Sequence, residues 1–122
     1  MTRPSTRDYF LDIAAVTATR ATCLRKQVGA VLVRDNRIIA TGYNGSPPGE
    51  PHCSDPETGC LIENSHCVRT VHAEINALLY AAKDGVSVDG ATLYCTITPC
   101  AVCMKLLRTA GVKSYIWRED YP

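Results

Sequence analysis

The segment at residues 28–42 contains two short runs rich in β-branched residues, VGAVLV and RIIATG, separated by Asp35 and Asn36. This arrangement is typical of a β-hairpin, in which a tight turn joins two antiparallel strands. The later pattern predicts a helix from about residue 72, a strand at 91–98, a helix at 100–110 and a strand at 112–118. A hairpin followed by alternating helices and strands favours an α/β fold, with a mixed sheet and helices on its faces.

Two helices have residues that we expect to face the core. Ser5 begins the first helix, with Asp8 three residues later as in a capping box, and this helix is predicted to extend to about residue 23. Its core-facing residues are predicted to be Phe10, Ile13, Ala14, Val16 and Thr17. In the helix that begins near His72, the predicted core-facing residues are Ile75, Leu78, Leu79 and Ala82.

Length and composition restrict the class of protein. A chain of 122 residues with 46% hydrophobic content predicts one globular domain over residues 1–122. A formal net charge of +1 argues against a surface for long nucleic acid, but is compatible with a small anionic ligand. No apolar run approaches the roughly 20 residues that span a membrane, and residues 1–10 lack the apolar region of a secretory signal. We therefore expect a soluble, cytoplasmic protein.

The seven cysteines favour metal binding or nucleophilic chemistry over disulfides, because their number is odd and the cytosol keeps thiols reduced. In PCAVC, Cys100 and Cys103 lie three residues apart in the first turn of a helix, on one face. A helix N-terminus lowers the pKa of a thiol, which favours the thiolate that a metal requires. His72 also begins a helix, and both helix starts can meet at one edge of the sheet. One imidazole and two thiolates would suit tetrahedral zinc, with a fourth position for water.

Glu74, two residues after His72, decides whether such a metal would be structural or catalytic. A glutamate that is not a ligand can take a proton from metal-activated water and return it to a substrate. The alternative is that His72 is a core histidine, Glu74 a helix-capping charge and the CxxC a redox pair. The sequence His-Ala-Glu upstream of the two cysteines favours the catalytic interpretation.

Four motifs together resemble the deoxycytidylate deaminases of bacteria and phages: GYNGSPPG, HAEINAL, GATLYCTITPC and AGVK. The resemblance extends over roughly residues 20–121 and includes the H-x-E and P-C-x-x-C signature of zinc nucleobase deaminases. It implies a three-layer α/β/α cytidine-deaminase-like fold. It also implies conversion of dCMP to dUMP with release of ammonia, which supplies dUMP for dTMP synthesis. His72, Cys100 and Cys103 would hold the zinc. Glu74 would protonate the pyrimidine N3 and deprotonate the water that attacks C4.

The resemblance also assigns substrate-binding residues. Asn44 would hydrogen-bond the deoxyribose 3′-hydroxyl, although its other interpretation is a turn asparagine before a glycine. Ala73, between the histidine and the glutamate, is also assigned to the substrate. The candidates for the 5′-phosphate are Arg25, Lys26, Arg118 and Tyr121.

Other functions stay open at this point. A related enzyme could act on cytosine, guanine or an adenosine in RNA, although the near-neutral charge and GYNG argue against RNA. A non-catalytic zinc module would have a filled fourth coordination position and would be indifferent to Glu74. Family members are often hexamers regulated by dCTP and dTTP. A homo-oligomer is therefore expected, whereas no motif in this sequence indicates triphosphate binding.

The segment at about 43–70 is rich in Gly, Pro, Ser, Asn, Cys and His and is far longer than an ordinary connection. So polar a loop cannot bury enough apolar surface to fix its own shape, whereas a structural zinc ion would stabilise it. Some phage dCMP deaminases carry an extra metal, with cysteines that align with Cys23 and Cys53. The predicted ligands are Cys23, Cys53, Cys60 and Cys67, with His66 as a substitute for one of the last two. The alternative is a mobile loop with free thiols.

Overall fold

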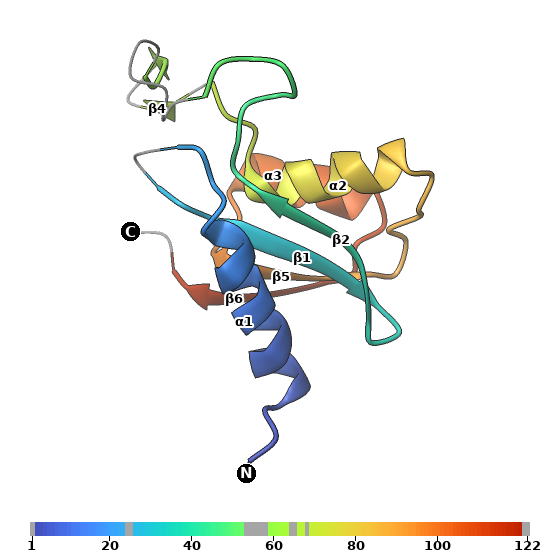
Figure 1. Cartoon of the computed structure of the whole chain (residues 1–122). Coiled ribbons are helices and arrows are strands. Elements are labelled where there is room, and N and C mark those ends of the chain that lie inside the picture. Colours follow the sequence, from blue (N-terminus) through green and yellow to red (C-terminus); the bar gives the residue numbers. More distant parts are fainter. Residues whose placement is uncertain (1, 24–25, 53–58, 64–65, 68, 121–122) are drawn as a thin grey trace.

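The structure, a computed structural model, describes residues 2–23, 26–52, 59–63, 66–67 and 69–120, with only the backbone for 62, 63, 66 and 67. Its elements are α1 (Thr6–Ala18), β1 (Gly29–Arg34), β2 (Arg37–Tyr43), β3 (Ile62–Glu63), β4 (His66–Cys67), α2 (Ala73–Lys83), β5 (Thr92–Ile97), α3 (Ala101–Thr109) and β6 (Ser114–Glu119) (Figure 1). The predicted order is confirmed, with the short pair β3 and β4 in addition.

Four strands form the main sheet in the order β2-β1-β5-β6. β1 is antiparallel to both β2 and β5, whereas β5 and β6 are parallel, so the sheet is mixed. α1 covers one face of this sheet, and α2 and α3 lie side by side on the other (Figure 1). The predicted α/β/α layering is therefore confirmed.

Two local signals in the sequence have the predicted effect. Ser5 caps α1, and its hydroxyl oxygen accepts a hydrogen bond from the backbone amide of Asp8 at 3.0 Å. In the hairpin turn, Asp35 and Asn36 have φ angles of 53° and 61°. Positive φ at both central residues is what a type I′ turn requires, and such turns match the twist of the flanking strands. The predicted end of the first helix is wrong, because α1 ends at Ala18 and not near residue 23.

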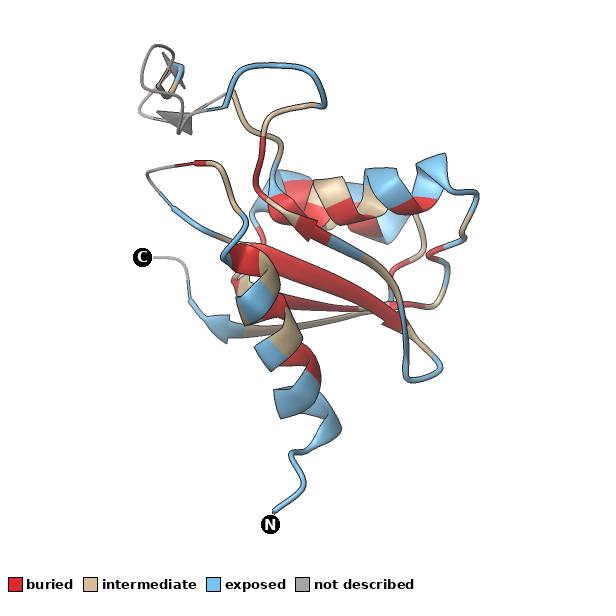
Figure 2. Ribbon diagram, viewed as in Figure 1, coloured by how far each residue is buried: buried red, intermediate tan, exposed pale blue. Residues whose placement is uncertain are grey.

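Most residues of β1 and β5 are buried (Figure 2). Strand side chains alternate between two cores, one on each face of the sheet. In β1, Ala30 and Leu32 face α2 and α3, whereas Val31 and Val33 face α1. The central strands β1 and β5 are buried on both faces because helices cover both. The core beneath α2 and α3 includes Cys95.

The face of α1 that meets the sheet differs in part from the predicted one. Phe10 and Ala14 are buried as predicted, but Val16 is exposed and Leu11 is buried instead. The cause is a close approach to β1 at Gly29, where a Cβ would lie 2.0 Å from the carbonyl oxygen of Ala14. The backbone of α1 lies against the strand at this point, so the helix orientation follows the glycine and not the bulk of its side chains.

The same correction applies to α2. Its buried alanines are one turn apart: Ala73, Ala77 and Ala81. Ile75 and Leu78 are half-buried, whereas Leu79 and Ala82 are exposed, so the prediction is wrong for the last two. A Cβ at Gly42 of β2 would lie 2.3 Å from the carbonyl oxygen of Ala73 and 2.5 Å from the amide nitrogen of Ala77. Only small side chains fit where the helix backbone comes this close.

The segment after β2 leaves the sheet and returns to it at one point. Gly45 and Val71 form an isolated antiparallel bridge with hydrogen bonds of 3.2 and 2.9 Å. Between these residues, β3 and β4 pair antiparallel, with Ile62 opposite Cys67. None of the helices in the described part of the chain is both long and apolar enough to span a membrane.

Candidate metal centre

The ends of two helices bring His72, Cys100 and Cys103 together. His72 is the N-cap of α2, and Cys100 is the N-cap of α3 with Cys103 one turn later. The Cys103 sulfur lies 3.2 Å from the His72 Nδ1 and 3.3 Å from the Cys100 sulfur, and the His72 Nδ1 lies 3.7 Å from the Cys100 sulfur. The three residues predicted as metal ligands therefore lie in one cluster.

This cluster suits zinc. Tetrahedral zinc with Zn–S near 2.3 Å and Zn–N near 2.05 Å separates neighbouring ligand atoms by roughly 3.5–3.8 Å. The three observed separations lie within about half an ångström of these values, so small side-chain rotations would admit the ion. Two thiols and one imidazole are also the donor set that zinc accepts, and three protein ligands leave one coordination position open.

Glu74 lies in the first turn of α2 and is only 4% exposed. Two buried thiols are close enough to respond to its charge. Burial raises the pKa of Cys95 to about 12, and the Glu74 charge is the next cause. Burial also raises the pKa of Cys103, again followed by the charge of Glu74. The carboxylate therefore lies close to the ligand Cys103 and away from the solvent.

The pKa of Cys103 contradicts one expectation from the sequence. The start of α3 was expected to lower the pKa of both cysteines, but the direction for Cys103 is upward. A helix end stabilises a thiolate only modestly, whereas burial and the adjacent carboxylate of Glu74 both oppose the charge. A divalent cation would reverse this balance, since a coordinating thiol is deprotonated.

Asn44 is 7% exposed and its side chain is engaged on both sides. Its Oδ1 accepts a hydrogen bond from the Val28 amide at 2.8 Å, and its Nδ2 donates to the Lys26 carbonyl at 2.6 Å. The side chain thus holds the segment before β1, a role that the turn interpretation did not include. One N–H of Nδ2 is left for another acceptor, so contact with the sugar stays a prediction.

The phosphate candidates have different surroundings. Lys26 is exposed beside Asn44, whereas Arg118 forms an ion pair of 2.8 Å with Asp12 of α1, on the opposite face of the sheet from α2 and α3. Arg25 and Tyr121 lie outside the described residues. Of the two phosphate candidates that the structure describes, Arg118 is therefore already in an ion pair and Lys26 is not.

Ala73 is fully buried, and its backbone carbonyl lies against Gly42 of β2. Its contact with a substrate stays a prediction.

Only part of the predicted second metal group can be placed. Cys23 is buried just beyond α1, and Cys60 is half-buried. Cys53 and the side chains of His66 and Cys67 lie outside the described residues. The backbone pairing of β3 and β4 brings residues 62–63 beside residues 66–67.

Asn76 is a residue of the site that the sequence interpretation missed. Its Nδ2 donates to the Tyr43 carbonyl at 2.8 Å, and so fastens α2 to the end of β2. A polar residue four positions after His72, in an otherwise apolar run, was the available signal.

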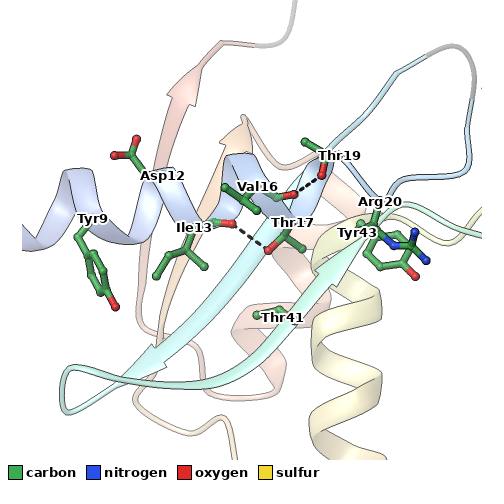
Figure 3. Close-up of a pocket in the computed structure, with 9 residues that line it drawn as sticks. All are labelled: Tyr9, Asp12, Ile13, Val16, Thr17, Thr19, Arg20, Thr41 and Tyr43. Atoms are coloured by element: carbon green, nitrogen blue, oxygen red, sulfur yellow. Dashed lines mark hydrogen bonds between the residues drawn. The ribbon is translucent and has the colours of Figure 1, made fainter.

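Two grooves flank the edge strand β2 without reaching the cluster. One has a volume of about 680 Å³ and lies between α1 and β2, lined by residues such as Tyr9, Ile13 and Thr41 (Figure 3). The other, of about 370 Å³, lies between β2 and α2 and includes Tyr80 and Asp84. Neither groove is lined by His72, Glu74 or the two ligand cysteines.

Comparison with known proteins gives a consistent result. Residues 4–119 match the model of the cytidine and deoxycytidylate deaminase zinc-binding region. The chain is 49% identical to ComE operon protein 2 of Bacillus subtilis, over 99% of this chain and 63% of that protein. It is 39% identical to the deoxycytidylate deaminase of Mycobacterium phage D29, over 98% of this chain and 99% of the phage protein.

A solved structure agrees with these sequence relatives. The dCMP deaminase of cyanophage S-TIM5, in complex with dCMP and dUMP, superposes with a TM-score of 0.84 at 33% identity. The alignment covers 99% of this chain and 86% of the cyanophage chain. By contrast, this chain spans less than two thirds of the length of the Bacillus relative.

Proposed function

Because the chain belongs to the cytidine and deoxycytidylate deaminase family, we propose that it hydrolyses dCMP to dUMP and ammonia. The observation that carries this proposal is the buried carboxylate of Glu74 beside the cluster of His72, Cys100 and Cys103. The phage D29 relative, which this chain matches almost end to end, is a deoxycytidylate deaminase, and this supports the choice of substrate. The cyanophage structure with dCMP and dUMP supports it further.

In this proposal His72, Cys100 and Cys103 hold a zinc ion. When bound, zinc supplies a water molecule that is activated because its pKa falls to about 7. Glu74 accepts a proton from the attacking water and delivers it to N3 of the pyrimidine. The hydroxide that remains adds to C4. A second proton, from the added hydroxyl, then passes through the same carboxylate to the amino group, the bond from C4 to this nitrogen breaks, ammonia leaves, and C4 becomes the carbonyl carbon of dUMP. Buried beside the ligands, Glu74 reaches both the water and the base without competition from bulk solvent.

The other end of the substrate meets residues near the start of β1. Lys26 is proposed to bind the 5′-phosphate, and Asn44 to use its remaining N–H for the 3′-hydroxyl. The backbone of Ala73 is proposed to contact the base. Arg25 and Tyr121 stay candidates for the phosphate.

A second zinc ion is also proposed, held by Cys23, Cys53, Cys60 and Cys67, with His66 as the substitute ligand. The burial of Cys23 and the pairing of β3 with β4 support an ordered anchor for the segment at about 43–70. With four protein ligands this zinc would be structural. Residues 1–122 are proposed to form one deaminase domain around both metals.

Three further features stay predictions: a homo-oligomer, which the family resemblance suggests is a hexamer; regulation by dCTP and dTTP; and a cytoplasmic location.

An absorbance assay tests the function, with dCMP, dCTP, cytidine and deoxycytidine compared side by side. The expected result is turnover of dCMP with the highest kcat/KM. A nucleoside would lack the charge-assisted contact that the phosphate of dCMP is proposed to make with the Lys26 ammonium. Equal kcat/KM values for deoxycytidine and dCMP would contradict the proposed preference. No turnover of any of the four would favour a non-catalytic zinc module.

A further inference from the structure

The side chain of Asn44 joins two parts of the site that lie far apart in the sequence. Its amide bridges the main chain of Lys26 and Val28, through the bonds of 2.6 and 2.8 Å described above. The main chain of Asn44 adds two more contacts to the same segment. Its amide donates to the Val28 carbonyl at 3.3 Å, and its carbonyl accepts from the Thr22 amide at 3.1 Å. The segment before β1 is thus held by one residue at four points.

The residues directly before and after Asn44 are hydrogen-bonded to residues close to the metal centre. Gly45, the next residue, pairs with Val71, which immediately precedes the ligand His72. The Tyr43 carbonyl, one residue earlier, accepts the hydrogen bond from Asn76 of α2. A continuous set of hydrogen bonds therefore runs from the backbone of Lys26 through Asn44 to the start of α2.

These hydrogen bonds limit the region that the positive charge of Lys26 can reach. The Lys26 side chain is exposed, and a lysine is a point charge on a flexible stem, so its backbone decides which region its ammonium can reach. We infer that Asn44 is a positioning residue that holds the backbone of Lys26 so that its ammonium meets the 5′-phosphate, and thereby sets the preference for nucleotides over nucleosides. The inference rests on the proposed function, and it gives Asn44 a role distinct from contact with the sugar.

Three substrates separate the two roles. They are dCMP, 2′,3′-dideoxycytidine 5′-monophosphate, which lacks the 3′-hydroxyl, and deoxycytidine, which lacks the phosphate. Asn44→Ala should lower kcat/KM by a similar factor for both nucleotides, roughly 10- to 100-fold, since small misplacements in a site are this costly. The loss for deoxycytidine should be much smaller. Thr41→Ala, an exposed change on β2 three residues before Asn44, is the matched control and should leave all three values unchanged. A loss for dCMP that is absent for the dideoxy nucleotide would overturn the inference in favour of a sugar contact.

A double variant tests whether Asn44 acts through Lys26. Lys26→Ala keeps the backbone carbonyl that Asn44 binds but removes the ammonium. If the inference holds, adding Asn44→Ala to Lys26→Ala should have little further effect on dCMP, because two residues that act as one unit are not additive. Independent, multiplying losses would overturn it.

Measurements that require no turnover test the inference independently of the proposed reaction. Hydrogen exchange should accelerate at the Val28 amide in Asn44→Ala and less so in Asn44→Asp, which keeps the acceptor for that amide. Asn44→Asp also serves if the alanine variant does not fold. Calorimetry should show that wild type binds dUMP more tightly than deoxyuridine, and that Asn44→Ala loses most of this difference. If wild type binds dUMP preferentially but deaminates nothing, the proposed function fails and the inference survives. Equal binding of dUMP and deoxyuridine by wild type would reject the inference.

Discussion

Glu74 is a carboxylate that the fold removes almost entirely from water. Burial of an ionised group is costly unless an opposite charge or several hydrogen bonds compensate for it. A cation at His72, Cys100 and Cys103 would provide that compensation, since these ligands begin the two helices beside Glu74. Metal binding and the burial of this carboxylate are therefore expected to stabilise each other.

Replacement of Glu74 by Gln is expected to leave the zinc content unchanged and to lower kcat by roughly 10²–10⁴. The amide has nearly the shape of the carboxylate but cannot accept the proton of the attacking water. Steady-state kinetics together with metal analysis check this. Asp84→Asn, the same chemical change at an exposed position that ends α2, is the control and should keep full activity. Retention of more than about a tenth of the wild-type rate in Glu74→Gln would remove Glu74 from the proposed role.

The chemistry of individual residues could be predicted where their spacing in the sequence determines it. The sequence interval from His72 to Cys100 and Cys103, on two helix starts, was sufficient to predict the cluster. The upward pKa shift of Cys103 was not, because it depends on burial and on a carboxylate from another helix. The engagement of Asn44 was not predictable either. Its partners are 16 and 18 residues away, and no local pattern reports such a contact.

At the scale of elements, the contact between α2 and β2 fixes the site. Gly42 allows the backbone of the helix to lie directly on the strand, and the alanines of α2 fill the remaining space. Periodicity correctly predicted that α2 is a helix, but it placed Leu79 and Ala82 in the core. It did so because it ranks side chains by apolar character and does not register how near a backbone can approach. The larger side chain of Leu79 is exposed for this reason.

Gly42→Ala is expected to destabilise the protein by roughly 1–3 kcal/mol, because the added methyl would overlap the backbone of α2. It should also lower kcat of the folded protein, since α2 carries His72 and Glu74. Urea unfolding and kinetics measure the two effects. Gly29→Ala makes the same overlap with α1 on the opposite face. It should destabilise the fold comparably and leave kcat near that of wild type. Equal effects of both variants on kcat would contradict a specific role for the contact between α2 and β2.

The hairpin turn offers a change in the opposite direction. Asn36 has a φ of 61°, a conformation that costs an L-residue energy and a glycine almost none. Asn36→Gly is expected to stabilise the protein by about 0.5–1 kcal/mol, because Gly is favoured at this position of a type I′ turn. The denaturation midpoint should rise with an unchanged slope. Asn36→Val should lower it. A lower midpoint for Asn36→Gly would mean that the asparagine side chain contributes more than its backbone conformation costs.

At the scale of the whole molecule, the number of bound metal ions tests whether the segment at about 43–70 has a zinc ion of its own, separate from the cluster of His72, Cys100 and Cys103. The layers, the mixed sheet and the order of elements followed from the alternation of helical and strand patterns. The small β3 and β4 pair did not, because strands of two residues leave no periodicity.

Two zinc ions per chain are expected in protein prepared without chelators. Cys53→Ser should lose one of them, while the cluster at His72, Cys100 and Cys103 keeps its own. Cys95→Ala, which changes a buried cysteine outside both predicted ligand sets, should retain both ions. Metal analysis by mass spectrometry gives the count. One zinc per wild-type chain would reject the second site and leave His66 and Cys67 as neighbours without a metal.

The bridge between Gly45 and Val71 determines where insertions and deletions in the chain are tolerated. The chain leaves the main sheet at Gly45 and returns at Val71, so the two ends of the connecting segment are hydrogen-bonded to each other. The entropy of closing such a segment grows only logarithmically, by about 0.6 kcal/mol for each doubling of its length. Insertions and deletions between the two bridge residues therefore cost the sheet little. The chain could therefore carry a longer or shorter segment at this place while the main sheet keeps its shape.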